Sequence, residues 1–157
     1  MSKRDFLSVD DVEPGELAAI LDGADRHKAD RRARDTLGGR TVALIFEKPS
    51  TRTRVSFEVA VHELGGYPLP LAGGDLQLGR GETLEDTAAV LSRYVHAIVL
   101  RTFAQESLER LARGGTVPVV NALSDYSHPC QALADRVRAL AERGPAARGH
   151  GAHVAER

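Results

Sequence analysis

The stretch TVALIFEKPSTRTRVSFEVAVHELGG, residues 41–66, decides the fold because its hydrophobic period changes once. Residues 41–46 (TVALIF) form a short apolar run between a glycine pair and Pro49, and this run is rich in residues that favour strands. After Pro49 the apolar residues Phe57 and Val61 recur at helical spacing, and a glycine pair follows as a stop signal. The sequence therefore predicts a buried strand, a tight turn and a helix in succession.

The same alternation continues on both sides of this stretch. Upstream, residues 12–33 predict a helix with Pro14 in its first turn, and its highly charged second half is interpreted as a solvated helix face. Downstream, apolar runs predict three further strands, and apolar stripes predict three further helices. The strands are residues 67–71, 97–100 and 117–121, and the helices begin near Thr83, Glu106 and Pro129.

Strands that alternate with helices indicate an α/β fold. We expect a parallel sheet of about four strands flanked by helices on both faces, in three layers. Open sheets of this class bind ligands at the carboxyl ends of their strands. The segments expected to carry the chemistry are therefore those that follow Phe46, Leu71, Leu100 and Asn121.

Length and composition limit the possible functions. The 157 residues suit one domain, and the net charge of −1 gives no broad positive field for nucleic acid or an anionic membrane. The amino terminus lacks an apolar signal segment, and no apolar run approaches the ~18 residues of a membrane span, so we expect a cytoplasmic protein. The single cysteine excludes an intrachain disulfide.

The turn after the first predicted strand has the composition of an anion site. Its polar residues are Ser50, Thr51, Arg52, Thr53 and Arg54. Hydroxyl groups, a guanidinium and the unpaired first-turn amides of a helix together suit a phosphate. The alternative is a capped helix whose arginines are merely solvated. A glycine-rich phosphate loop of the GxxxxGK type is absent, which disfavours nucleoside-triphosphate chemistry.

Two further elements bring polar residues to the same edge. Arg101 directly follows the predicted strand 97–100, although a surface arginine that ends a strand is the alternative. His128 precedes Pro129 at the start of the last helix, where its imidazole can donate to a carbonyl or phosphate oxygen. Gln131 lies one turn further on. A helix start with a polar cap is the alternative here.

Other polar residues give no comparable sign of a functional site. His128 and Cys130 form no metal site, because no second cluster supplies further ligands, and we expect no metal. Cys130 has no evident partner base, so it is not expected to be a nucleophile. Gln77 lies in a glycine-rich segment that predicts only an exposed loop.

Three segments resemble the transcarbamoylases. FEKPSTRTRVSFEVAVHELGG resembles the Ser-Thr-Arg-Thr-Arg motif of that family, and HPCQALAD resembles its second signature. The His-Pro-Cys-Gln form and the segment DLQLGRGETLEDTAAVLSRY are similar to the ornithine carbamoyltransferase branch. The aspartate branch usually has Thr in place of this Cys and no lysine before the proline, and it remains the nearest alternative. The resemblance covers roughly residues 5–142.

The resemblance implies an enzyme that transfers a carbamoyl group from carbamoyl phosphate to ornithine and produces citrulline, as in arginine biosynthesis. It implies that Arg101 bridges phosphate and carbonyl oxygens, and that His128 and Gln131 contact the carbamoyl group. The phosphate would be held by the Ser50–Arg54 segment, and Gln77 would reach a site from a neighbouring subunit. The family enzyme is a trimer or a multiple of trimers and uses no cofactor.

The resemblance ends before the family pattern does. We expect residues 1–142 to form the carbamoyl-phosphate-binding domain and residues 143–157 to be a disordered tail. The second domain, which binds ornithine in this family, is expected to be absent. The isolated chain is therefore expected to bind carbamoyl phosphate without forming citrulline, and to engage ornithine only if another chain supplies that domain. A non-catalytic binding module or a non-functional fragment is the alternative.

Overall fold

The computed structural model describes residues 3–31, 35–72 and 81–142. Its elements are the 3-10 helix η1 (Val9–Asp11), α1 (Pro14–Ala29), β1 (Thr41–Phe46), α2 (Thr51–Glu63), β2 (Tyr67–Ala72), α3 (Leu84–Leu91), β3 (Ala97–Arg101), α4 (Gln105–Gly114), β4 (Val119–Leu123) and α5 (Pro129–Glu142). Within these described residues, no helix combines the length and apolar character that crossing a membrane requires.

The four strands form one parallel sheet with the order β2-β1-β3-β4. Because all strands run in one direction, their carboxyl ends meet at one edge. The pairing of β3 with β4 shifts register there, since Leu100 pairs with Asn121 but Arg101 pairs with Leu123. Such an irregularity changes the direction of the backbone locally, and here it lies beside Arg101.

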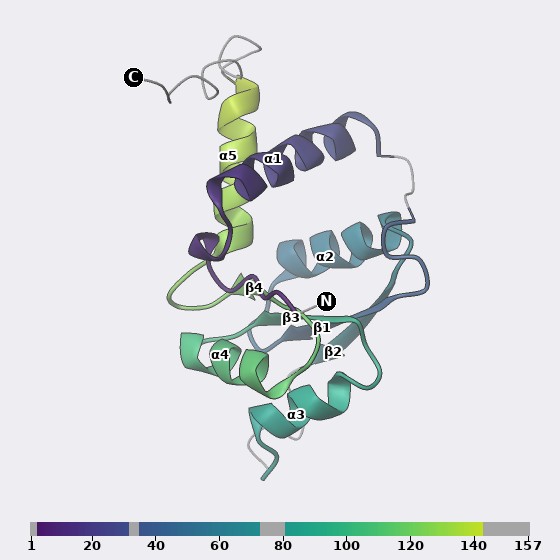
Figure 1. The fold of residues 1–157 in the computed structure, drawn as a ribbon, viewed down its shortest axis with the longest axis vertical. Helices are drawn as coiled ribbons and strands as arrows, with labels where there is room; N and C mark the ends of the chain where they lie inside the picture. Colours follow the sequence, from purple (N-terminus) through teal and green to yellow (C-terminus); the bar gives the residue numbers. More distant parts are fainter. Residues whose placement is uncertain (1–2, 32–34, 73–80, 143–157) are drawn as a thin grey trace.

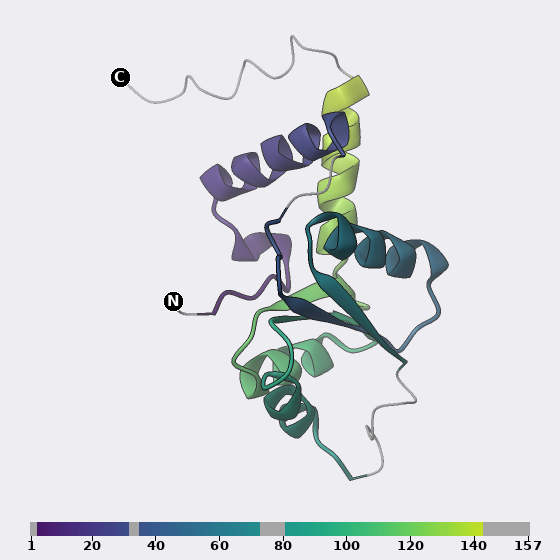
Figure 2. The same cartoon turned by 90° about the vertical axis from the view of Figure 1, so that its right-hand side faces the viewer.

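Helices cover both faces of the sheet, as expected for three layers (Figures 1 and 2). One face carries α1, α2 and α5, and the other carries α3 and α4. Along β1 the side chains alternate between two cores: Ala43 and Ile45 join the core under α3 and α4, while Val42 and Leu44 join the core under α2. Since both faces of β1 are buried, the run TVALIF is apolar throughout.

The two edge strands of the sheet, β4 and β2, differ in what lies beside them. Beside β4, Phe6 pairs in parallel with Val120, and the Phe6 amide donates to the Val119 carbonyl at 2.8 Å. β2 carries Pro68 and Pro70 and has no further strand beside it among the described residues.

Two element boundaries predicted from sequence were wrong. The first helix was expected over 12–33 but spans 14–29, and its C-cap Asp30 has extended backbone. The charged run is therefore only partly helical, and Arg31 donates to Glu63 of α2 at 2.7 Å instead of facing solvent alone. The last strand was expected over 117–121 but spans 119–123.

The end of α2 confirms its predicted glycine stop. Gly65 has φ of +82°, a left-handed conformation that suits a residue without Cβ. Its amide donates to the His62 carbonyl and the Gly66 amide donates to the Val61 carbonyl, both at 2.9 Å. These bonds satisfy carbonyls of the last turn and send the chain directly into β2.

Candidate active site

An open pocket of about 680 Å³ lies at the carboxyl edge of the sheet. Its lining residues are Pro49, Ser50, Thr51, Arg52, Thr53, Ser56, Arg101, Leu123, His128 and Gln131. The sequence-predicted residues come together here from three elements, with two exceptions. Arg54 does not line this pocket, and Gln77 lies outside the described residues.

The start of α2 presents a set of donors to the pocket. Ser50 is the N-cap of α2, but its side chain makes no capping hydrogen bond. The first amides of a helix have no carbonyl partner within the helix, and they lie at the positive end of its dipole. The hydroxyl groups and amides of this turn are therefore available to an anion.

Arg54 was predicted in the anion cradle, but it is not among the residues that line this pocket. Its Nε donates to Glu58 Oε1 at 2.7 Å, one turn further along α2. Arg54 lines a neighbouring pocket together with Glu47 and Lys48. Residues four positions apart lie on the same face of a helix, so this ion pair holds Arg54 beside Glu58 and away from the anion pocket.

Arg101 is held at the pocket by the end of β3. Its Nη1 donates to the Thr53 hydroxyl at 3.4 Å, which joins it to the α2 side of the pocket. Its Nε is buried and has no hydrogen-bond partner in the described part of the chain. Arg101 therefore has a donor available for a ligand oxygen.

His128 faces the same pocket from the start of α5. Burial lowers the pKa of His128 below its ordinary value, the positive charge of Arg101 lowers it further, and Asp135 opposes both effects. Its Nδ1 is buried and lacks a partner among the residues described. A neutral imidazole beside a guanidinium is suited to hydrogen-bond a ligand oxygen without adding charge repulsion.

Gln131 lies on the first turn of α5 and lines the pocket. Its side-chain amide nitrogen donates to Asp135 Oδ1 at 3.0 Å, so the carboxamide is already oriented by its own helix. None of the carboxylate side chains in the described ranges lines this pocket. Its donor set therefore suits a small anion that carries phosphate-like and carbonyl-like oxygens.

Cys130 does not supply a nucleophile. Burial raises the pKa of its thiol to about 11, and its Sγ contacts the Asn121 carbonyl at 3.4 Å. Since the thiolate is the reactive form, this cysteine is unreactive near neutral pH. Among the described residues, no group of three or more His, Cys, Asp or Glu side chains is arranged to hold a metal ion.

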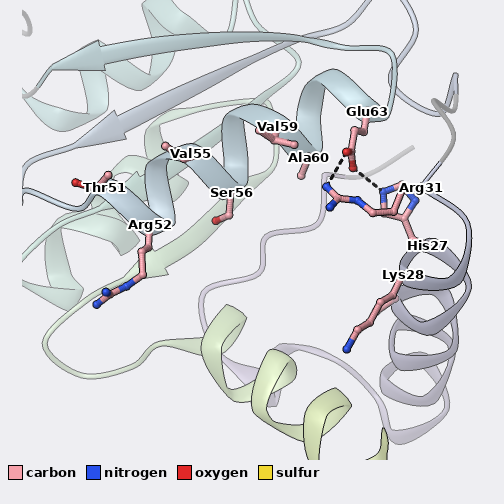
Figure 3. Close-up of a pocket in the computed structure, with 11 residues that line it drawn as sticks. His27, Lys28, Arg31, Thr51, Arg52, Val55, Ser56, Val59, Ala60 and Glu63 are labelled. Carbon is pink, nitrogen blue, oxygen red and sulfur yellow. Dashed lines mark hydrogen bonds and ion pairs between the residues drawn. The ribbon is translucent and has the colours of Figure 1, made fainter.

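Another pocket, of about 750 Å³, lies between α1 and α2 and adjoins the anion pocket (Figure 3). It shares Thr51, Arg52 and Ser56 with the anion pocket, but its middle is formed by apolar residues such as Val55 and Val59. Figure 3 shows Glu63 at the far end, joined to Arg31 and His27. The sequence did not predict this groove, because it depends on where α1 lies relative to α2 in the fold.

The loops at the pocket rim are cross-linked by contacts that the sequence did not reveal. We call residues 47–50, 102–104 and 124–128 the three rim loops. The Thr102 hydroxyl bonds to the Glu47 carboxylate, and the Glu47 amide donates to the Arg101 carbonyl at 2.9 Å. The Thr102 amide donates to the Leu123 carbonyl at 3.0 Å. Lys48 forms an ion pair with Asp125, and its Nζ lies 4.2 Å from the centre of the Phe103 ring.

The chain is similar to known proteins over nearly all its described length. Residues 4–140 match the model of the family described as aspartate/ornithine carbamoyltransferase, carbamoyl-P binding domain. Ornithine carbamoyltransferase of Parafrankia sp. (strain EAN1pec) is 65% identical over 139 residues, which are 86% of this chain and 44% of that protein. The enzyme of the same name from Acidothermus cellulolyticus is 62% identical over 142 residues, or 90% of this chain and 46% of that protein.

Solved structures agree with this result. Ornithine carbamoyltransferase from Pyrococcus furiosus superposes with a TM-score of 0.84 at 49% identity, covering 91% of this chain and 47% of that one. The chain thus spans about half the length of the curated relatives it matches. With its parallel sheet and its pocket of hydroxyl, guanidinium and imidazole groups, this chain belongs to the aspartate/ornithine carbamoyltransferase family and carries the carbamoyl-phosphate-binding domain of that family.

Proposed function

We propose that residues 1–142 bind carbamoyl phosphate as one half of an ornithine carbamoyltransferase. The observation that carries this proposal is the pocket that joins the start of α2, Arg101 and His128. Two buried nitrogens there, Arg101 Nε and His128 Nδ1, have no partner within the described structure. A ligand with both phosphate and carbonyl oxygens satisfies the donors of this pocket.

The proposed chemistry is an amine attack on the carbamoyl carbon. The neutral δ-amine of ornithine forms the new C–N bond, the bond between that carbon and the phosphate oxygen breaks, and the nitrogen then gives a proton to the departing phosphate. Arg101 and His128 stabilise the negative charge that develops on the carbonyl oxygen. The departing phosphate is held by Arg52, the hydroxyl groups and the amides of the α2 start. No covalent intermediate with the protein is required.

Ornithine is favoured over aspartate as the amine because relatives that share 49–65% identity with this chain are named ornithine carbamoyltransferase. The half of those proteins that this chain does not match is proposed to supply the amine site. Assembly into trimers, a contribution of Gln77 to a neighbouring site, a role in arginine biosynthesis and a cytoplasmic location stay predictions.

The test is calorimetric titration of the chain with carbamoyl phosphate, with inorganic phosphate as a stable second ligand. Arg52→Ala should weaken binding by about 2 kcal/mol, or about thirtyfold, because charge-assisted hydrogen bonds to the phosphate are lost. Arg138→Ala is the matched control, since Arg138 is exposed and pairs with Glu142 at the other end of α5. Equal affinities of wild type and Arg52→Ala would refute the assignment.

A further inference from the structure

Lys48 connects two rim loops that are not neighbours in the sheet. β3 lies between β1 and β4, so the main-chain bonds at the rim join the first loop to the end of β3 and the second loop to the third. Lys48 extends from the first loop, passes over the Phe103 ring of the second and pairs with Asp125 of the third. We call these two contacts the Lys48 bridge.

The bridge lies close in sequence to all three groups of pocket residues. Lys48 is two positions before Ser50, and Phe103 is two positions after Arg101. Asp125 is three positions before His128. A displacement of any rim loop therefore moves the nearby pocket residue, because two or three residues of backbone are too short to absorb the movement.

The environment of Lys48 indicates a structural connection and not direct contact with an anion. Only 17% of its side chain is exposed, and its charge is already paired with Asp125. Lys48 does not line the anion pocket. Its ammonium group instead faces an aromatic ring, a contact that favours a fixed position for the cation.

We propose that Lys48 is a positioning residue: the Lys48 bridge fixes the separation of the three rim loops and so presets the anion pocket for its phosphate-bearing ligand. This inference rests on the proposed function, since it assigns Lys48 a part in the same site. Binding to a preset pocket avoids the entropy cost of ordering the loops when the ligand arrives.

The change in anion affinity caused by Asp125→Asn distinguishes this proposal from a simple effect of charge. If Lys48 and Asp125 act on the anion only through space, Lys48→Met weakens binding and Asp125→Asn strengthens it. If the bridge sets the geometry, both substitutions weaken binding, and the double variant is no weaker than either single variant. Asp125 is 66% exposed, so Asp125→Asn changes the bridge with little risk to folding.

The experiment measures carbamoyl phosphate affinity by calorimetry for the wild-type chain, Lys48→Met, Asp125→Asn and the double variant. We expect each variant to bind about three- to tenfold more weakly, and Lys48→Arg to bind nearly as well as wild type. Arg110→Met is the matched control, because it removes a partly exposed ion pair with Glu85 on the opposite layer. It should lower the melting temperature without changing the affinity.

Hydrogen exchange of the ligand-free chain provides an independent readout. The Asp125 amide donates to the Phe103 carbonyl at 2.8 Å, and it should exchange faster in Lys48→Met than in Arg110→Met. Tighter binding by Asp125→Asn, additive losses in the double variant, or unchanged exchange in Lys48→Met would each overturn the proposal. Failure of the wild-type chain to bind carbamoyl phosphate would instead refute the proposed function, and the positioning role with it, whatever the exchange rates show.

Discussion

Arg101 and His128 each keep a buried nitrogen without a protein partner in the described part of the chain. A buried donor or acceptor that lacks a partner costs about 1–3 kcal/mol. The cost falls on two residues that line one pocket, and we expect a bound oxyanion to remove it. Ligand binding should therefore raise the melting temperature of the chain, since the ligand binds the folded state.

The pKa of His128 leads to a prediction about pH. Because burial and Arg101 lower the pKa of the folded residue below its unfolded value of about 6.5, the folded chain binds fewer protons than the unfolded chain once the pH falls below that value. The stabilisation from neutral His128 is complete above pH ~6.5 and is lost as the pH falls towards the folded pKa. The free energy of unfolding, measured with urea, should fall between pH 7.5 and 5.5.

The control for this prediction is His128→Gln, in which that decrease should be smaller because the titrating group is gone. An imidazole titration followed by NMR gives the folded pKa directly. A value at or above that of an unfolded histidine would contradict the structural assignment.

At the scale of single residues, the sequence predicted most of the residues that line the pocket but not the contacts between the rim loops. Ser50, Thr51, Arg52, Thr53, Arg101, His128 and Gln131 all line the pocket as expected. Arg54 was included because the motif was interpreted as a set of residue types, and the contact that turns Arg54 towards Glu58 appears only in the folded helix. The Lys48 bridge was missed because it depends on three loops that meet only in the folded chain.

Among the elements, α3 and α4 pack against each other on one face of the sheet. The backbones approach closely at Gly114, the last residue of α4, where an added Cβ would lie 2.4 Å from the Glu85 Cα. A backbone atom cannot move aside as a flexible side chain can. Gly114→Ala should therefore force α3 and α4 apart.

We expect Gly114→Ala to lower the free energy of unfolding by about 1–3 kcal/mol, measured by urea denaturation. Gly23→Ala is the matched control, because Gly23 is inside α1 and an added Cβ there would meet the flexible Arg26 side chain at 3.8 Å, an ordinary contact distance. That variant should be stabilised by about 0.5–1 kcal/mol through better helix propensity. A Gly114→Ala chain as stable as wild type would show that the two helices separate without cost.

Element types were predicted correctly from hydrophobic period, but boundaries depended on features that periodicity does not contain. The last strand begins at Val119 because Pro118 cannot donate to the ladder, although its carbonyl accepts from the Ile98 amide at 2.9 Å. The helix predicted to begin near Thr83 ends at Leu91, so Val95 lies beyond it. It is nevertheless buried, because the turn after α3 returns it to the core.

At the scale of the whole molecule, the chain matches 44–46% of the length of its two relatives described above. We predict that the isolated chain binds carbamoyl phosphate but forms no citrulline from ornithine. Co-expression with the unmatched half of the Parafrankia relative should restore citrulline formation, measured by a colorimetric assay. The same mixture made with Arg52→Ala is the control and should be strongly impaired. Steady citrulline production by the isolated chain would contradict the prediction that the unmatched half is required for the reaction.

The prolines of β2 have a consequence for how this molecule meets others. The Tyr67 amide points towards β1, where it donates to the Arg40 carbonyl at 2.8 Å, so amides at positions 68 and 70 would point outward. Proline occupies both positions and has no amide hydrogen to offer. At these two positions, the edge of β2 therefore offers an extended peptide carbonyl acceptors but no amide donors. These prolines therefore disfavour edge-to-edge pairing of β2 with a strand of another chain.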